Sequence, residues 1–335
     1  MNKILVIQTA FIGDAILATA LLESLHAEYP QAEIDFLVRK GNEGLFHKHP
    51  FLHELIVWNK QTAKYKDWWR ILRHIRRRRY DAVINVQRFA ATGLWTALSG
   101  ATFTAGFNKN PLSFAFTHRV AHHFNRGMHE IERNHRLIAP LVKQETPLRP
   151  RLYPSADDYA CVAPYQSAGP YICIAPASVW FTKQYPAHKW IAFIQSLPPS
   201  LTVYLLGGPA DKALCTRIAA AAGTRPVYNL AGELSLLQSA ALMQKAVMNY
   251  ANDSSPLHLA SAMNAPITAV YCSTVPGFGF YPVSGQSHIV ESQEKLSCRP
   301  CGIHGHKQCP KGHFRCAESI QTAQLSACLP ALPSS

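Results

Sequence analysis

The sequence predicts an α/β protein with two doubly wound parallel sheets, because a strand–helix–strand alternation occurs twice along the chain. In the first half, Lys3–Gln8 is a buried apolar strand, a helix opens at Asp14, and Glu33–Val38 is the next strand. In the second half the alternation restarts at Tyr171–Ala175. Strands joined through helices form parallel sheets with right-handed crossovers, and such sheets bind ligands at the carboxyl ends of their strands.

A proline-rich stretch separates the two halves. Five prolines occur between Glu145 and Pro170. Because proline lacks a backbone donor and fixes φ, this density predicts an extended linker rather than core. We therefore predict two domains, residues 1–150 and residues 151–335, each long enough to have its own core.

Composition bounds the partners and the compartment. The 33 Lys and Arg residues exceed the 20 Asp and Glu residues, which gives a net charge of +13. This excess favours anionic partners, such as phosphates, acidic glycolipid, an anionic membrane face or nucleic acid. No apolar run reaches transmembrane length, and Met1–Gln8 lacks the segment order of a signal peptide. We expect a cytosolic chain whose nine cysteines are mostly free thiols.

The loop after the first strand lies at the functional edge of the predicted sheet, and it contains Thr9 and Gly13 just before Asp14. It lacks G-x-G-x-x-G, so a dinucleotide fingerprint is absent. Asp14 has two interpretations. It complements the helix dipole as an acidic residue of the first turn, or it is a carboxylate that accepts a proton from an acceptor hydroxyl. Its position in the sequence favours the first interpretation.

Lys64–Arg79 is the most basic segment of the chain. Trp68, Leu72 and Ile75 fall on one helical stripe, and arginines that include Arg70 and Arg73 cover much of the remaining surface. A basic amphipathic helix with aromatic residues suits a membrane surface or a phosphorylated glycolipid. The alternative is a solvated helix face with a buried stripe. Nucleic-acid binding is less favoured, because no recognised module accompanies the basic run.

Three loops of the second half are predicted to converge on one ligand. Lys183, the segment 207–211 and the segment 253–258 each follow a predicted strand of the same sheet. Loops at the carboxyl ends of neighbouring parallel strands lie close together. The sequence therefore predicts a single binding site at this edge.

The third of these loops begins the helix that follows the Ala246–Tyr250 strand. Ser254 and Ser255 offer N-cap hydroxyls, and Pro256 suits the first helical turn. Free N–H groups at such a turn, with the positive end of the helix, form a site for an anion. The alternative is an ordinary βα turn with an acidic cap at Asp253.

The end of the chain carries a cysteine pattern, C-x2-C-x7-C-x6-C, formed by Cys298, Cys301, Cys309 and Cys316. A C-x-x-C pair with further Cys or His residues fits a structural zinc site, and free or redox-labile thiols are the alternative. A catalytic metal is not expected, because no open-site carboxylate pattern accompanies the cysteines. The residues from Glu318 to Leu332 are predicted to form a final helix.

Four segments resemble glycosyltransferase family 9, the ADP-heptose:lipopolysaccharide heptosyltransferases. In chain order they are I-L-V-I-Q-T-A-F-I-G-D-A at 4–15, T-K-Q-Y-P at 182–186, L-L-G-G-P-A-D at 205–211 and N-D-S-S-P-L-H-L-A at 252–260. The resemblance is specific because all four occur in order and span nearly the whole chain. It implies a GT-B fold, in which two Rossmann-like domains face one another across a cleft.

The resemblance also implies an inverting, metal-independent transfer of heptose from ADP-heptose to an inner-core sugar of lipopolysaccharide. Asp14 would be the base that deprotonates the acceptor hydroxyl, and Lys183 would neutralise the departing pyrophosphate. We assign Thr9, Gly13, Arg70 and Arg73 to the acceptor side.

On the donor side, the resemblance implies a phosphate contact at Ser178 and a hydrogen bond from a sugar hydroxyl to the carboxylate of Asp211. The remaining donor residues are Asp253, Ser254, Ser255 and His258. Three departures from the family pattern concern the identity of the donor sugar. Ser255 replaces a glycine, Trp180 and Phe181 are bulky, and Asp211 is shorter than the glutamate of some members.

The expected partners are ADP-heptose or a related nucleotide sugar, a lipopolysaccharide core acceptor and an anionic membrane surface, without nucleic acid. No cofactor is expected to be required beyond the ADP-sugar substrate. The expected location is cytoplasmic, peripheral to the inner membrane. The alternatives are a family member that uses another nucleotide sugar or acceptor, and a non-catalytic binder of anionic glycolipid or nucleic acid.

Overall fold

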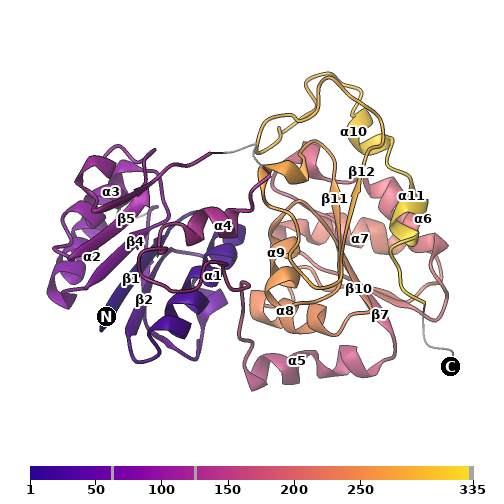
Figure 1. Ribbon diagram of the computed structural model, residues 1–335. Helices are drawn as coiled ribbons and strands as arrows, with labels where there is room; N and C mark the ends of the chain where they lie inside the picture. The colour runs from indigo at the N-terminus through magenta and orange to yellow at the C-terminus, as the bar shows by residue number, and fades with distance from the viewer. Residues whose placement is uncertain (62–63, 124–126, 332–335) are drawn as a thin grey trace. The chain divides into compact units, whose positions relative to one another are not determined.

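The computed structural model describes residues 1–61, 64–123 and 127–331 of the 335-residue chain. Its residues divide into two compact units, Met1–Tyr153 and Pro154–Ser335, shown in Figure 1. The division follows Tyr153, whereas the sequence placed the boundary after residue 150.

The first unit is built on a six-stranded sheet in which every neighbouring pair of strands is parallel, in the order β3-β2-β1-β4-β5-β6. The strands are β1 (Lys3–Gln8), β2 (Glu33–Arg39), β3 (Leu52–Trp58), β4 (Ala82–Asn85), β5 (Phe103–Phe107) and β6 (His118–Val120). The central strands β1 and β4 are buried along almost their whole length. Continuous apolar runs in these strands are typical of a parallel sheet covered on both faces.

Helices cover both faces of the first sheet (Figure 1). α1 and α4 pack together on one face, and α2 and α3 pack together on the other. The helices are α1 (Ile12–Glu28), α2 (Lys64–Arg78), α3 (Ala90–Ala97) and α4 (Glu130–His135). Beneath α2 and α3 the core includes Trp95, whose ring stacks on Trp68 at a centroid distance of 5.9 Å.

The second unit repeats this topology with a parallel sheet in the order β12-β11-β10-β7-β8-β9. The strands are β7 (Tyr171–Ala175), β8 (Thr202–Leu205), β9 (Val227–Asn229), β10 (Met248–Asn252), β11 (Ile267–Tyr271) and β12 (Ser287–Glu291). In chain order within each unit, both sheets follow the sequence 3-2-1-4-5-6 of a Rossmann-like fold. The order reverses between β1 and β4 in the first unit, and between β7 and β10 in the second.

Helices also cover both faces of the second sheet. α5, α8 and α9 pack together, and α6 packs against α7 and α11 (Figure 1). The helices are α5 (Ala156–Ser167), α6 (Ala187–Ser196), α7 (Lys212–Ala221), α8 (Leu236–Gln244), α9 (Ser255–Ala262), α10 (Arg315–Glu318) and α11 (Thr322–Ser326). Two doubly wound parallel sheets confirm the α/β class that the sequence predicts.

The prediction of an extended linker through residues 145–170 was wrong in its second half, where α5 forms. The helix begins with a hydrogen-bonded cap in which the Asp158 amide donates to the hydroxyl of Ser155 at 3.3 Å. Pro164 is accommodated inside the helix. The capping signal and packing against α8 therefore outweigh the local cost of proline.

Two further boundaries differ from the prediction. β10 runs two residues later than the predicted Ala246–Tyr250 strand, because the amides of Asn249 and Asn252 are satisfied within the protein. The single helix predicted from Glu318 is wrong. Two short helices, α10 and α11, occupy this region, and the predicted end at Leu332 lies outside the described residues.

Candidate functional site

Two of the polar residues predicted in the second half, Lys183 and Asp253, meet at the point where its strand order reverses. Asn252, at the carboxyl end of β10, is fully buried. Its Nδ2 donates to the carbonyl of Pro176 at 2.8 Å, and its Oδ1 accepts from the amide of Tyr185 at 2.9 Å. This side chain therefore holds both ends of the turn that follows β7. The turn contains Ser178 and Lys183.

Lys183 and Asp253 form the central ion pair of this edge. The Lys183 ammonium lies 2.7 Å from Oδ2 of Asp253, and their side chains are 14% and 10% exposed. The same carboxylate oxygen accepts a hydrogen bond of 2.7 Å from the buried hydroxyl of Thr274, which follows β11. Two predicted site residues thus come from different strand ends, and a third strand end orients the carboxylate.

The start of α9 adjoins this pair. Ser254 occupies the N-cap position in an extended conformation, but its hydroxyl donates to the carbonyl of Asn252 at 3.3 Å rather than capping the helix. Ser255 and Pro256 form the first helical turn and are partly exposed. His258 lies within α9 and is buried. Amide groups at such a helix start, with the positive end of its dipole, favour a bound anion.

Ser178 and Asp211 lie on the loops after β7 and β8. The carbonyl of Ser178 accepts from Nε2 of Gln184 at 2.7 Å, which fixes the turn internally. Asp211 accepts from the amide of Gly208 at 2.8 Å. Gly207 is required here, because a Cβ at this position would lie 2.8 Å from Cβ of Asp211. The G-G-P-A-D segment is therefore a tight turn that presents one carboxylate at the edge of the sheet.

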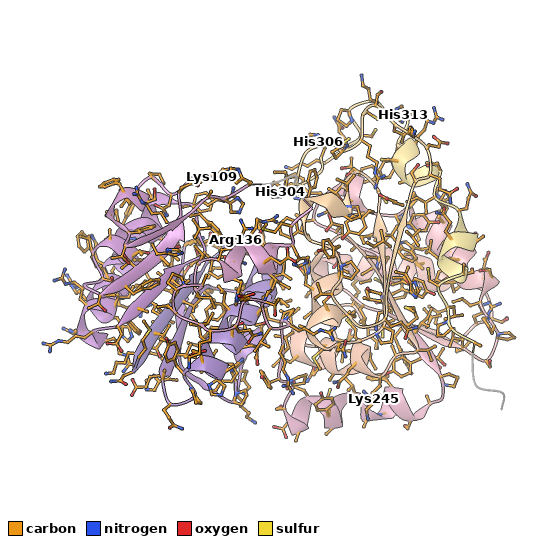
Figure 2. All side chains as sticks on the ribbon, viewed as in Figure 1. Lys109, Arg136, Lys245, His304, His306 and His313 are labelled. Atoms are coloured by element: carbon orange, nitrogen blue, oxygen red, sulfur yellow. The ribbon has the colours of Figure 1, made fainter. Side chains whose placement is uncertain are left out.

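A loop from the end of the chain packs against the Lys183 turn. The amide of Thr182 donates to the carbonyl of His306 at 3.1 Å, and the amide of His306 donates to Oγ1 of Thr182 at 2.8 Å. His306 is labelled in Figure 2 on the long loop before α10. Gly305 adopts φ +75°, and a Cβ there would lie 2.8 Å from the Thr182 hydroxyl. The sequence did not predict this contact between the cysteine-rich end and the donor turn.

The equivalent edge of the first unit is lined by neutral polar groups. Gln8, Asn85 and Gln87 are buried at the ends of β1 and β4, and Nε2 of Gln87 donates to Oε1 of Gln8. Thr9 is 1% exposed, and its hydroxyl has no hydrogen-bond partner among the described residues. The Thr9 carbonyl accepts from Lys60 at 2.8 Å. An unpartnered buried hydroxyl marks this edge as a place where a polar ligand is favoured.

Asp14 is half-buried in the first turn of α1, which begins two residues earlier than predicted, and Gly13 beside it is buried. Oδ2 of Asp14 accepts from the amide of Phe11 at 3.2 Å. This bond satisfies one of the unpaired amides at the helix start. The carboxylate is therefore fixed by the backbone at the carboxyl edge of the sheet.

A second carboxyl group, which the sequence did not single out, lies near Asp14. Glu130 of α4 is buried, and its Oε2 accepts from Arg133 at 2.8 Å. Burial raises the pKa of Glu130 to about 7, and the charge of Asp14 adds to this rise while Arg133 opposes it. Two carboxyl groups in different environments are a common arrangement for acid–base chemistry. Packing of α4 on α1 creates the arrangement.

The predicted acceptor residues Arg70 and Arg73 lie elsewhere in the first unit, on α2. They line a hollow on the surface of this helix, together with Lys66, Asp67, His74 and Arg77. Arg70 is half-exposed, forms a 2.6 Å ion pair with Asp67 and donates to the carbonyl of Val57. The buried stripe of the alternative interpretation is present, because Leu72 and Ile75 are buried and Trp68 is partly buried, whereas the adjacent Trp69 is exposed. The basic hollow therefore lies on α2, whereas Thr9 follows β1 and Gly13 lies in the first turn of α1.

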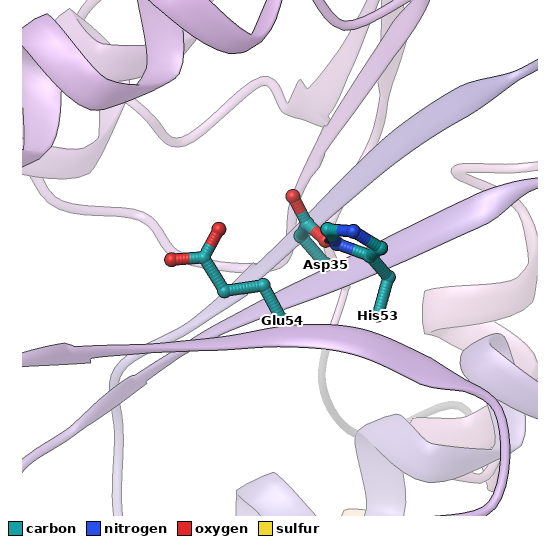
Figure 3. Close-up of side chains that lie close together, drawn as sticks. All are labelled: Asp35, His53 and Glu54. Carbon is teal, nitrogen blue, oxygen red and sulfur yellow. Dashed lines mark hydrogen bonds and ion pairs between the residues drawn. The ribbon is translucent and has the colours of Figure 1, made fainter.

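One group of three metal-capable side chains was found in the described part of the chain, formed by Asp35, His53 and Glu54 on β2 and β3 (Figure 3). Nδ1 of His53 lies 2.9 Å from Oδ1 of Asp35. The other oxygen of Asp35 accepts from Arg78 at 3.1 Å and from the Tyr80 hydroxyl at 2.5 Å. A guanidinium already balances the buried carboxylate, so we interpret this group as a structural ion cluster.

A protein-family model described as "Glycosyltransferase family 9 (heptosyltransferase)" matches residues 68–313. Because the match covers more than half of the chain, the protein belongs to this family. It is therefore a glycosyltransferase, as the sequence motifs predict. The position of the Lys183–Asp253 pair at the strand-order reversal agrees with the ligand position expected for this type of sheet.

Individual relatives are similar at low identity. "Lipopolysaccharide heptosyltransferase 1" of Pseudomonas aeruginosa is 26% identical over 321 residues, which cover 89% of this chain and 86% of that protein. Among solved structures, a family 9 glycosyltransferase from Veillonella parvula matches with a TM-score of 0.85 and 19% identity, over 98% and 96% of the two chains. The structure of "E. coli ADP-heptose lps heptosyltransferase II" matches with a TM-score of 0.79 and 23% identity, over 98% of each chain. These likenesses confirm the predicted GT-B class with two Rossmann-like domains.

In the described residues, no helix combines the length and the apolar character that crossing a bilayer demands.

Proposed function

We propose that this glycosyltransferase transfers a heptose from ADP-heptose to a sugar of the lipopolysaccharide inner core. The Lys183–Asp253 ion pair beside the start of α9 is the observation on which the proposal depends most. The names of the P. aeruginosa and E. coli relatives, which mention lipopolysaccharide and ADP-heptose, support the choice of donor and acceptor.

In this proposal the second unit binds the donor. Lys183 supplies a positive charge for the pyrophosphate, and the amides at the start of α9 supply hydrogen-bond donors. Asp253 and Thr274 hold the ammonium in place before the donor binds. Ser178 contributes a phosphate contact, and Asp211 and His258 contribute contacts to the sugar or ribose. These charges and donors act on the leaving group, so the proposed transfer is independent of a metal ion.

In the first unit, Asp14 is the proposed general base. The acceptor hydroxyl gives its proton to the Asp14 carboxylate as its oxygen attacks the anomeric carbon from the face opposite ADP. The bond from that carbon to the ADP oxygen breaks in the same step, through an oxocarbenium-like transition state, and the anomeric configuration inverts. Glu130, which is partly protonated near its pKa of about 7, lowers the local negative charge beside Asp14.

We also propose how the acceptor and the membrane are bound. Thr9 and Gly13 lie beside the proposed base, where the unpartnered Thr9 hydroxyl is a donor for a sugar oxygen. Arg70 and Arg73, with the rest of the basic hollow on α2, bind the anionic groups of the acceptor or of the lipid surface. This places the enzyme in the cytoplasm, peripheral to the inner membrane.

A second donor remains a candidate because of the turn before Lys183. Phe181 is 46% exposed and Val179 is 82% exposed, so both are available to contact a sugar. Ser255 adds a side chain at the start of α9 where the family pattern has glycine. Because Phe181 and Ser255 differ from the family pattern, the identity of the donor sugar should be tested with several nucleotide sugars rather than with ADP-heptose alone.

The test is mass spectrometry of products formed from a panel of nucleotide sugars with lipopolysaccharide core acceptors. We expect a mass increase of one heptose with ADP-heptose, and an anomeric configuration by NMR that is opposite to that of the donor. Transfer of another sugar alone would replace the proposed donor. An absence of transfer from every donor, with the protein still stabilised by acidic glycolipid, would favour the non-catalytic binder.

A further inference from the structure

The cysteine loop, residues 292–314, connects β12 to α10 and forms neither helix nor strand. It contains Cys298, Cys301 and Cys309, and Cys316 follows in α10. Between Cys298 and Phe314 the only aliphatic side chain apart from proline is that of Ile303. An irregular segment of this length has too little apolar surface to form a core of its own, so other interactions, such as a bound metal or contacts with the rest of the unit, must hold its conformation.

The thiols are the inward-facing side chains of this segment. Cys316 is buried and the other three cysteines are partly buried. The three histidines, by contrast, are exposed, and Figure 2 labels them along the loop as His304, His306 and His313. All nine cysteines of the chain, each within the described residues, are free thiols. The cysteines of this segment are therefore more buried than its histidines.

The four cysteines, all within the described residues, belong to one loop and the helix that follows it, although no three of their sulfur atoms lie within 4.8 Å of one another. Sγ of Cys301 donates to the carbonyl of Cys298 at 3.1 Å, and Sγ of Cys298 lies 4.0 Å from Nε2 of His313. The charges of Cys298, Cys301 and Cys309 all act on the Cys316 thiol, so the four cysteines share one neighbourhood of the fold. Neighbouring ligand atoms of a tetrahedral zinc thiolate site lie about 3.8 Å apart. Binding of a metal therefore has to draw the four sulfur atoms together, and the irregular loop allows this movement.

The charge around the thiols suits a site that becomes anionic. Residues 292–316 contain five Lys or Arg residues and one acidic residue, a net of +4. Arg299 is partly buried, and its charge opposes the rise that burial causes in the pKa of Cys316. Four thiolates with one divalent cation carry a charge of −2, which these basic residues balance.

We propose that Cys298, Cys301, Cys309 and Cys316 bind one Zn²⁺ in a closed, tetrahedral structural site. On binding, the four thiols release their protons to solvent and each sulfur forms one bond to the metal, with no change of oxidation state. All four coordination positions belong to the protein, so the site has no open position for a substrate. His313 is a neighbour of the site and remains outside the ligand set.

The zinc site supports the Lys183 turn through the loop. The amide of Cys301 donates to the carbonyl of Ser273 at 2.8 Å, and Ser273 donates from its hydroxyl to Thr182. Arg299, between two of the ligands, donates to the carbonyls of Cys272 and Thr274 at 2.8 Å. Fixing the loop by a metal therefore fixes residues on both sides of the Lys183–Asp253 pair.

The experiment measures metal content by inductively coupled plasma mass spectrometry, on full-length protein purified without chelator. We expect about one zinc per chain in the native protein. Cys298→Ser, Cys301→Ser, Cys309→Ser and Cys316→Ser should each lose most of the zinc, whereas Cys161→Ser, at an exposed thiol of α5, should retain it. His313→Ala should also retain it. Full zinc content in the four loop variants, or iron in place of zinc in the native protein, would overturn the assignment.

Because a loop variant can lose zinc by misfolding, a second measurement uses the native chain reconstituted with Co²⁺. Four thiolate ligands should give an intense sulfur-to-cobalt charge-transfer band together with the visible bands of tetrahedral cobalt. Octahedral bands without charge transfer would contradict the site, as would disulfide bonds among the four cysteines in mass spectra of the purified protein. A third measurement is the affinity for ADP before and after zinc removal, and it is the only one of the three that depends on the proposed donor site. An unchanged affinity would contradict the link between the zinc site and the donor site, but not the zinc site itself.

Discussion

At the ends of β7 and β10, charged groups of the second unit are joined by short hydrogen bonds, whereas the ends of β1 and β4 in the first unit carry buried amides. Both places are the strand-order reversal of the same topology. In the second unit, Lys183, Asp253 and Thr274 are held at distances of 2.7 Å. In the first, Gln8 and Gln87 occupy the reversal. The shared fold fixes where a ligand binds, and the side chains at that point decide which ligand.

The two edges also differ in how they are supported. The Lys183 turn is held by Asn252 from β10 and by Thr182 contacts with the cysteine loop. Asp14 is held mainly within its own helix turn, with Glu130 of α4 nearby. A rigid, cationic edge suits a diphosphate, and a carboxyl pair suits proton transfer. The predictions below separate these two roles.

The largest effect is expected from Asp14→Asn, which removes the proposed base. Turnover with ADP-heptose should fall by about 10²–10⁴-fold, because the acceptor hydroxyl loses its proton acceptor. Asp157→Asn is the matched control, since Asp157 is also an acidic residue in the first turn of a helix. Initial rates by product mass spectrometry measure both. If the two variants kept similar activity, Asp14 would have only the role of complementing the helix dipole.

A somewhat smaller effect is expected from Lys183→Ala. Without the positive charge of Lys183, the negative charge that develops on the leaving ADP is less stabilised, and kcat/KM should fall by about 10²–10³-fold. Lys212→Ala is the control, because Lys212 also forms a short ion pair, with Glu233, but on an exposed surface of the same unit. Unchanged kinetics in Lys183→Ala would move the phosphate contact to another residue.

The sequence predicted most of the fold and part of each edge. β1 and β7 have the predicted bounds, because their apolar patterns are local signals. The predicted end of β10 was two residues short, since Asn252 resembles a loop residue until its partners are known. The role of Asn252 as the clamp of the Lys183 turn depends on contacts to Pro176, distant in the chain, which no local pattern encodes.

The first unit shows the same limit. Asp14 was found from its motif, but Glu130 and Arg133 were not. Nothing in the sequence distinguishes Arg133 from its neighbours Arg119, Arg126 and Arg136 as a partner for an acidic group. The structure pairs Arg133 with Glu130 in the interior, and Arg126 lies outside the described residues. Choice among equivalent charges is made by tertiary packing.

The carboxyl pair of the first unit predicts a pH dependence of stability. Burial raises the pKa of Glu130 from 4.5 to about 7, so folding favours its protonated form. The free energy of unfolding should therefore fall as the pH rises from about 4.5 through about 7, by up to about 3 kcal/mol. Urea titrations across this range should show the slope in the native protein and a flatter profile in Glu130→Gln. If the free energy of unfolding changed equally with pH in both proteins, another group would be responsible for the titration. Glu132→Gln is the control at a neighbouring carboxyl group and should keep the native slope.

The smallest effect is expected on the basic hollow of α2. The double variant Arg73→Gln and Arg77→Gln should weaken binding to vesicles that contain anionic lipid by about 1 kcal/mol for each charge. The paired control is Arg217→Gln with Lys245→Gln, two exposed basic residues of the second unit. Vesicle sedimentation at two salt concentrations measures the loss. An equal reduction by both pairs would indicate attraction by net charge alone.

The division of roles between the two edges is tested most directly by calorimetric measurement of ADP affinity in Asp14→Asn and Lys183→Ala. We predict an unchanged dissociation constant for Asp14→Asn and one at least about tenfold weaker for Lys183→Ala, since in the proposed function only the second unit contacts the diphosphate. Weaker ADP binding in Asp14→Asn with native affinity in Lys183→Ala would contradict the account.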